Sequence, residues 1–309
     1  MVAQVIVASG VAIWVGAASY VHFRGRVRHK LTRQLTDHST LMAPYNVLTY
    51  FFSAVPNTPV LDPRAFPELG RLQANWEAIR EEAAQLYEAG HIAVAAKYND
   101  ISFNTFFKRG WKRFYLKWYG DFMPSARKLC PRTVALVESI PSVHAALFAY
   151  MAPHSRLGEH RDPFGGSLRY HLGVITPNSP MCRISVDGQE HYWKDGEALL
   201  FDETFIHSAR NDTDQPRIIL FCDVERPIRN STMRAINRFM CHSVVKISQA
   251  QNNEQERVGA LNWASSGIYS LKLLFTRLKG MNRTLYYCVK YLLLAALLYW
   301  FIVALFSPA

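Results

Sequence analysis

The chain has 309 residues, which is enough for one catalytic domain with additional segments or for two small domains. Half of the residues are hydrophobic and the formal net charge is +11. Because the positive charge is concentrated beside two apolar ends, it indicates membrane topology and anionic lipid headgroups and argues against a nucleic-acid partner. The five cysteines form no Cys-X-X-Cys pair, so they favour reduced thiols over a disulfide scaffold or a zinc site.

The N-terminal residues 1–23 are predicted to form a transmembrane anchor. They contain no charged side chain, and their length is close to the roughly 20 residues that cross a bilayer. The basic run RGRVRHK (residues 24–30) follows the apolar stretch instead of preceding it. This order favours an uncleaved anchor over a cleaved signal peptide.

Residues 24–65 are predicted to form a basic juxtamembrane and apolar interfacial segment. Within it, residues 41–60 are apolar and aromatic but are interrupted by prolines. Two interpretations remain open, a loop packed on the folded domain or a segment that dips into the membrane interface.

Residues 66–230 are predicted to form the main folded domain. Apolar residues recur at spacings of three and four between Phe66 and Gly90, which indicates helix. Residues 123–139 are predicted to form two short helices that are separated at Pro131. Residues 143–227 contain short apolar or alternating runs divided by Gly, Pro, Asn and Asp, a pattern typical of an antiparallel β-sandwich or barrel.

Residues 231–284 are predicted to be helical, with an amphipathic stretch at 261–280 that either lies on the membrane or packs on the domain. Residues 285–306 are predicted to form a second transmembrane anchor. Basic residues follow the first anchor and precede the second. The positive-inside rule therefore places the middle of the chain in the cytosol and both termini outside.

One short motif carries candidate chemistry. In GEHRDPFGG, His160 and Asp162 are two apart, so on an extended segment their side chains lie on the same face. With a distant histidine such as His207, they would provide the two-histidine, one-carboxylate face of a non-haem iron site. Arg217 lies on an apolar strand, where a charge needs a partner, and arginine pairs with carboxylates in two-pronged geometry.

Three longer stretches carry a family resemblance: HRDPFGGSLRYHLGVITPN, DGEALLFDETFIHSARN and RIILFCDVERP. Through them, residues 111–227 resemble the aspartyl/asparaginyl β-hydroxylase family of Fe(II)- and 2-oxoglutarate-dependent dioxygenases. Within that family, the blocks WKRFYLKWYG and DGQEHYW and the apolar ends are most similar to the membrane-bound lipid A 2-hydroxylases. The resemblance implies an α+β fold in which a double-stranded β-helix (jelly-roll) core, at about residues 143–227, is flanked by helices.

The resemblance also implies a site that uses Fe(II), the cosubstrate 2-oxoglutarate and dioxygen. The metal ligands would be His160, Asp162 and His207. The animal peptide hydroxylases of the family have glycine where this chain has Asp162, so Asp162 either ligates iron directly, which we expect, or contacts it through water. The residues that bind 2-oxoglutarate would be Arg217, Arg169 and His171. Taken singly, His171 is also consistent with a satisfied core histidine.

The implied function is hydroxylation at C2 of an acyl chain of lipid A or its precursor. It would take place on the cytosolic face of the bacterial inner membrane, in a two-span protein with a cytosolic catalytic domain. No protein partner is inferred. The first alternative is a hydroxylase of Asp or Asn side chains in peptides, and the second is a non-enzymatic, membrane-anchored β-barrel binding module. The predicted walls of an acyl-chain slot are Tyr50, Phe51, Phe52, Phe114, Tyr115 and Trp118. The predicted contacts to lipid phosphates are Arg109, Lys112, Arg113 and Arg156.

Overall fold

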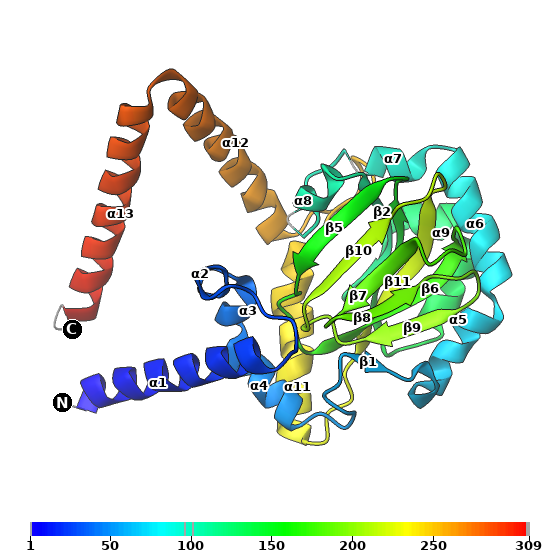
Figure 1. Ribbon diagram of the computed structural model, residues 1–309, viewed down its shortest axis with the longest axis horizontal. Helices are drawn as coiled ribbons and strands as arrows, with labels where there is room; N and C mark the ends of the chain where they lie inside the picture. Colours follow the sequence, from blue (N-terminus) through cyan, green and yellow to red (C-terminus); the bar gives the residue numbers. More distant parts are fainter. Residues whose placement is uncertain (1, 96, 101, 307–309) are drawn as a thin grey trace.

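A computed structural model describes residues 2–95, 97–100 and 102–306. Its centre is formed by two antiparallel sheets, one of seven strands in the order β1-β9-β6-β11-β4-β2-β3 and one of four strands in the order β5-β10-β7-β8 (Figure 1). The strands are β1 Val60–Leu61, β2 Trp111–Trp118, β3 Asp121–Phe122, β4 Val143–Met151, β5 Ser155–His160, β6 Ser167–Ile175, β7 Cys182–Val186, β8 Gln189–Tyr192, β9 Ala198–Phe201, β10 His207–Asn211 and β11 Arg217–Glu225. The expected mixture of helices with antiparallel sheets is confirmed.

Helices cover the larger sheet, as Figure 1 shows for α6 and α9. This helical layer consists of α5 Gly70–Ala74, α6 Trp76–Glu88, α7 His91–Ala95, α8 Asn104–Phe107, α9 Pro124–Leu129 and α10 Pro131–Glu138. The apolar face of α6 is buried through Ile79, Ala83 and Leu86, at the spacing that the sequence predicted. The two short helices expected around Pro131 are confirmed, and each begins with a proline at its first position, where no backbone N–H is needed.

The N-terminal segment folds onto the domain through four helices, α1 Val2–Phe23, α2 Leu31–Gln34, α3 His38–Leu41 and α4 Ala43–Phe51, and two short 3-10 helices follow at η1 Pro63–Ala65 and η2 Pro67–Leu69. The sequence leaves two interpretations of residues 41–60 open, and α4 occupies most of the first half, so this part is helical and not a loop. Ala43 and Tyr50 of α4 pack with Ala17 and Val21 of α1 in a small apolar cluster. Phe51, on the other face of α4, is 77% exposed.

Arg24 corrects the expectation that the whole basic run meets lipid headgroups. Its guanidinium is buried, forms an ion pair with Asp202 and lies between the rings of Tyr50 and Phe205. Arg226 Nη2 also approaches Asp202 Oδ2, at 2.8 Å. Burial by itself would raise the pKa of Asp202, but the two arginines outweigh it and hold the pKa well below its usual range.

The C-terminal part is helical, as predicted. It contains α11 Ser231–Phe239, the π-helix η3 Met240–Val245, the 3-10 helix η4 Lys246–Ser248, α12 Ala260–Met281 and α13 Arg283–Phe306. Within the described residues, one helix, at Gln4–Phe23, is long and apolar enough to cross a membrane. The second span stays a prediction, because many side chains of α13 lie outside the described part of the chain.

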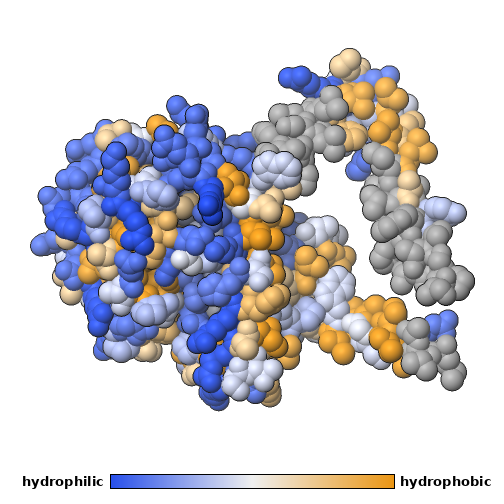
Figure 2. Space-filling model, turned by 180° about the vertical axis from the view of Figure 1, so that it is seen from behind, coloured by the Kyte–Doolittle hydropathy of each residue, from blue (hydrophilic) through white to orange (hydrophobic). Residues whose placement is uncertain are grey.

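The two helical ends project from the same side of the domain (Figure 1). In Figure 2, the projecting helices carry most of the strongly hydrophobic surface in view, whereas the body is mainly hydrophilic. Val5, Ile6, Ile13 and Trp14 of α1 are exposed by 40% or more. This arrangement is consistent with a domain that lies beside a membrane.

We predict that Arg24→Ala destabilises the folded domain although residue 24 directly follows the first apolar helix. Arg226 still pairs with Asp202 in this variant, so the expected loss is that of one buried hydrogen-bonded charge contact, about 1.5–3 kcal/mol. The matched control is Arg26→Ala, which removes an exposed arginine of the same run. Urea unfolding of the detergent-solubilised protein measures the free energy of unfolding of the two variants. Equal stability of Arg24→Ala and Arg26→Ala would contradict the buried ion pair.

Candidate active site

The two histidines of the predicted metal site are brought together by strand pairing. His160 is the last residue of β5, His207 is the first of β10, and the two lie directly opposite each other in the antiparallel register. Their ring centroids are 4.2 Å apart. Asp162 follows two residues after His160, and the ligand atoms of all three side chains lie within 4.8 Å of one another. Such a group can hold one metal ion.

An irregularity in β5 turns His160 towards the cavity. His207 pairs with His160, but Ala209 pairs with Leu157, so three steps along β5 match two steps along β10. Strict alternation would place Leu157 and His160 on opposite faces of the sheet. The extra residue, a β-bulge at Gly158–Glu159, puts both on the cavity side.

The imidazoles are oriented as metal ligands require. Nδ1 of His160 lies 2.8 Å from the carbonyl of Gly158, and Nδ1 of His207 lies 3.0 Å from the carbonyl of Phe205. Because a carbonyl oxygen only accepts, each Nδ1 carries the hydrogen and each Nε2 keeps a free lone pair. Burial lowers the pKa of both rings, that of His207 to about 3, so both are neutral at pH 7.

Asp162 contributes an ionised carboxylate. Burial would raise its pKa, but Arg169 and the two histidines lower it overall. Its backbone N–H donates to the carbonyl of Glu203 at 2.9 Å, and its Oδ2 accepts from Arg169 Nη2 at 3.0 Å. The carboxylate is therefore fixed from two sides beside the histidines.

Arg169 lies beneath Asp162 in a buried ionic network. It also pairs with Glu203 and, at 2.8 Å, with Asp223, which accepts a further hydrogen bond from the hydroxyl of Tyr119. With all three carboxylates ionised the network has a formal surplus of negative charge. Burial, and to a smaller extent the nearby Asp162 carboxylate, raises the pKa of Asp223. A nearby metal cation would relieve that surplus. Arg169 thus holds Asp162 in place, and its predicted contact with a cosubstrate stays a prediction.

Arg217 is a buried cation that lacks a carboxylate partner among the residues that the structure describes. It is 2% exposed, its Nε has no hydrogen-bond partner, and its guanidinium lies 4.2 Å from the ring centroid of Trp193. Burial lowers its pKa to about 10, so it still carries its charge at pH 7. An anionic ligand in the cavity would supply the missing partner.

His171 differs from a satisfied core histidine. Its Nδ1 accepts a hydrogen bond from Trp193 Nε1 at 3.3 Å, so Nε2 must carry the hydrogen of the neutral ring. That Nε2–H is buried and has no partner. The pKa lies well below its usual value because of burial and of the nearby Arg169 and Arg217. The ring therefore offers a free donor.

All six residues predicted for the site line one cavity of about 40 Å³. Its remaining walls are Phe103, Phe106, Trp111, Ala149, Leu157, Ile184, Trp193, Phe201, Ala209, Ile219 and Phe221. The predicted slot walls at Tyr50–Phe52, Phe114, Tyr115 and Trp118 were wrong for this cavity, since Phe51 is exposed and most of the others are buried elsewhere. The actual walls come from both sheets, from helix α8 and from the connecting residues Phe103 and Trp193, and no local motif marks them.

The N-terminal helices are hydrogen-bonded to residues 161–165, the loop after β5 that contains Asp162 and is called the ligand loop below. Arg161 Nη1 donates to the carbonyl of Val21 in α1 at 2.7 Å, and the ring of His38 lies 2.7 Å from the carbonyl of Arg161. Asn46 of α4 donates to the carbonyl of Pro163 and accepts from Gly165 N–H. Helix α1 and the ligand loop are thus directly hydrogen-bonded.

The sequence matches a known family over half of its length. The family described as Aspartyl/Asparaginyl beta-hydroxylase matches residues 73–227. Ornithine lipid ester-linked acyl 2-hydroxylase of Rhizobium tropici is 34% identical over 192 residues, which cover 60% of this chain and 66% of that protein. Aspartate beta-hydroxylase domain-containing protein 2 of Homo sapiens is 29% identical over 205 residues, which cover 63% of this chain and 54% of that protein.

Human Aspartyl/asparaginyl beta-hydroxylase is 28% identical over 165 residues, which cover 50% of this chain and 21% of that protein. Each alignment thus spans less than two thirds of the relative's own length. The matched region contains the two sheets, except β1, and all six cavity residues predicted from the sequence.

We predict that His160→Ala and His207→Ala each abolish binding of Fe(II) or Mn(II), since a methyl group cannot replace a ligand nitrogen. Asp162→Gly should weaken metal binding by at least about tenfold. Losing a residue that only hydrogen-bonds to a metal ligand already costs about 10–100-fold in affinity, and losing a direct ligand should cost no less. The matched control is His154→Ala, which removes an exposed histidine paired with Asp214. Equilibrium dialysis with metal analysis measures all four, and unchanged affinity in Asp162→Gly would exclude Asp162 as a ligand.

Proposed function

This chain belongs to the aspartyl/asparaginyl β-hydroxylase family, and we propose that it is an Fe(II)- and 2-oxoglutarate-dependent hydroxylase of a lipid acyl chain. The observation that carries the proposal is one cavity lined by two histidines and an aspartate that could hold a metal ion and by a buried arginine without a carboxylate partner among the described residues. These are the parts that this chemistry needs. The antiparallel sheets around the cavity would form its double-stranded β-helix.

The residues fit iron(II). Two neutral imidazoles with free Nε2 lone pairs and one ionised carboxylate form the donor set that non-haem iron oxygenases use, with the opposite face open. Bound iron, with 2-oxoglutarate and dioxygen, would supply the oxidising power that inserts oxygen into an aliphatic C–H bond.

The protein would orient the cosubstrate and keep the cavity dry. Arg217 would bind the far carboxylate of 2-oxoglutarate, which would supply the ion-pair partner that it lacks among the described residues. The free Nε2–H of His171 would donate to an oxygen of the same ligand. Arg169 would keep Asp162 ionised and in position. The aromatic walls would exclude water from the reacting atoms.

An exposed apolar surface supports a substrate in the membrane. The surface is formed by short helices beside α1, namely α2, α3, α4 and α11, with α3 and α4 in contact with α1 and α11 in contact with α4. Its exposed residues are Leu31 at 66%, Leu35 at 77%, Leu41 at 73%, Phe51 at 77%, Ile236 at 43% and Phe239 at 64%. We propose that this surface rests on the bilayer where α1 enters it.

The proposed location is the cytosolic face of a bacterial inner membrane, with a second span at residues 285–306. The basic residues after the first apolar helix and before the second support this topology. The name of the Rhizobium relative, an acyl 2-hydroxylase, supports a lipid substrate and attack at C2. The sequence blocks shared with lipid A 2-hydroxylases favour lipid A or its precursor.

A peptide substrate is the second candidate, because human Aspartyl/asparaginyl beta-hydroxylase also matches. The exposed apolar surface favours the lipid. A non-enzymatic binding module would not explain why ligand histidines and an unpaired arginine share one buried cavity.

We predict that Arg217→Ala raises the KM for 2-oxoglutarate far more than it lowers kcat. Losing one partner of a desolvated charge pair costs about 2–5 kcal/mol of binding. The matched control is Arg183→Ala on β7, whose arginine is paired with Glu190 at the surface. Succinate release as a function of 2-oxoglutarate concentration measures both, and an unchanged KM would contradict the assignment.

We predict that expression in a Gram-negative host without the modification raises the mass of part of its lipid A by one oxygen. Tandem mass spectrometry should place the oxygen at C2 of an acyl chain, and His160→Ala should remove it. If the lipid stays unchanged while a peptide gains a hydroxylated Asp or Asn, the peptide candidate replaces the lipid.

A further inference from the structure

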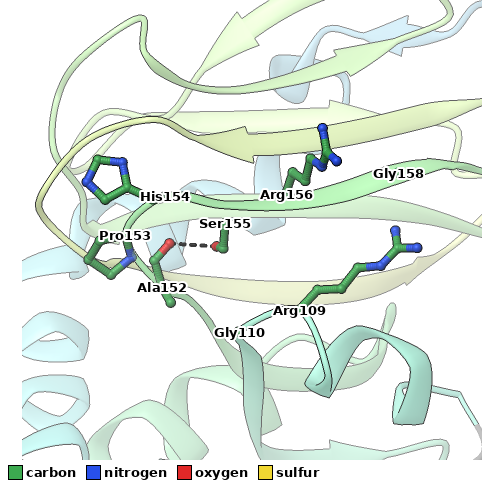
Figure 3. Close-up of a pocket in the computed structure, with 8 residues that line it drawn as sticks. All are labelled: Arg109, Gly110, Ala152, Pro153, His154, Ser155, Arg156 and Gly158. Atoms are coloured by element: carbon green, nitrogen blue, oxygen red, sulfur yellow. Dashed lines mark hydrogen bonds between the residues drawn. The ribbon is translucent and has the colours of Figure 1, made fainter.

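An open pocket of about 770 Å³ lies beside the strand that carries His160. It is formed where the turn before β2 meets the end of β4 and the first half of β5, as Figure 3 shows. Its lining is Arg109, Gly110, Ala152, Pro153, His154, Ser155, Arg156 and Gly158. The pocket contains basic side chains and no acidic one.

Two of the basic groups have no acidic partner within the described residues. His154 pairs with Asp214 at 2.8 Å, whereas Arg109 and Arg156 are exposed and form no ion pair. Figure 3 shows the Arg109 side chain extending along the pocket towards Gly158, and Arg156 rising from β5 itself. The pocket therefore presents two free positive charges.

The strand register makes the isolation of Arg156 unusual. Arg156 lies opposite Arg210 of β10, which lies opposite Arg183 of β7, so three arginines are adjacent across the sheet. Like charges in such positions repel each other. Arg210 is neutralised by Asp212 at 2.5 Å, and Arg183 by Glu190 at 3.0 Å. Arg156 alone of the three lacks an acid, which leaves room for an external anion.

Gly158 connects this pocket to the metal site. On one side, a side chain at this position would place its Cβ 3.0 Å from Arg109 Nη1, so the glycine lets the guanidinium approach the strand. On the other side, its carbonyl accepts the hydrogen bond from His160 Nδ1. Gly158 lies two positions before His160 in β5.

We propose that this basic pocket binds a phosphate group on the headgroup of the acylated substrate, an inference that rests on the proposed lipid hydroxylation. Two free guanidinium groups balance a phosphate monoester, which carries about −1.5 to −2 charges, better than they balance one carboxylate. C2 of an ester-linked chain is adjacent to the ester carbonyl. Oxidation there brings the headgroup end of the lipid close to the metal, which is where the pocket lies.

Calorimetric binding with the full chain in neutral detergent tests the proposal without requiring turnover. The probes are dihexanoyl phosphatidic acid, neutral dihexanoylglycerol and inorganic phosphate. The wild type should bind the phosphorylated lipid at least about tenfold more tightly than the neutral one, and Arg109→Gln and Arg156→Gln should each remove most of this preference. The matched control is Arg210→Gln, which removes the neighbouring arginine that Asp212 already neutralises. This variant should keep the preference for the phosphorylated lipid.

The outcomes separate this inference from the proposed function. Equal affinity for the two lipids, or an equal loss in Arg210→Gln, overturns the phosphate pocket even if the protein hydroxylates lipid. Selective binding that depends on Arg109 and Arg156 supports the pocket even if no acyl hydroxylation is found. Inorganic phosphate that binds as tightly as the phosphorylated lipid overturns the headgroup assignment, because the pocket would then take free phosphate.

Discussion

The site depends on one extra residue in strand β5. The bulge at Gly158–Glu159 turns His160 to the same face as Leu157, while the register keeps it opposite His207. A slip of one residue in this pairing would move His160 to the outer face and separate the two imidazoles. Asp162 lies two positions after His160, just beyond the end of β5, and its carboxylate lies in the same cavity. The geometry of the metal ligands is therefore a property of the backbone register.

The surrounding structure fixes this register from both sides. Arg169 and its carboxylates hold Asp162 from within the larger sheet. The N-terminal helices hold the ligand loop from the outside, through bonds from Arg161 and Asn46 to the main chain. The helix that could cross a membrane is thus attached to the loop between the ligands, not to a remote surface. In a membrane protein this attachment would set the height of the metal site above the bilayer.

The sequence predicted the chemistry of the site better than its surroundings. His160, Asp162, His207, Arg169, His171 and Arg217 line one cavity because they lie in ordered motifs on predicted strands. The two helices around Pro131 and the apolar face of α6 followed from local signals. These features depend on near neighbours in the chain.

The contacts that sequence reasoning missed join residues far apart. Arg24 is followed by four further basic residues, and nothing local shows that Asp202, 178 positions later, binds it. The bulge in β5 is not evident from the composition GEH, because glycine fits many backbone conformations. The cavity walls combine residues of both sheets and α8, and only the packed structure brings them together.

Pulsed EPR of the protein loaded with vanadyl, as a stand-in for iron(II), tests the metal centre most directly. We expect nitrogen couplings from two imidazoles in the wild type, and we expect no imidazole coupling in His160→Ala or His207→Ala, because neither variant should hold the metal at this site. A wild-type spectrum with one imidazole coupling or none, or couplings that persist in both variants, would contradict the centre built by β5 and β10.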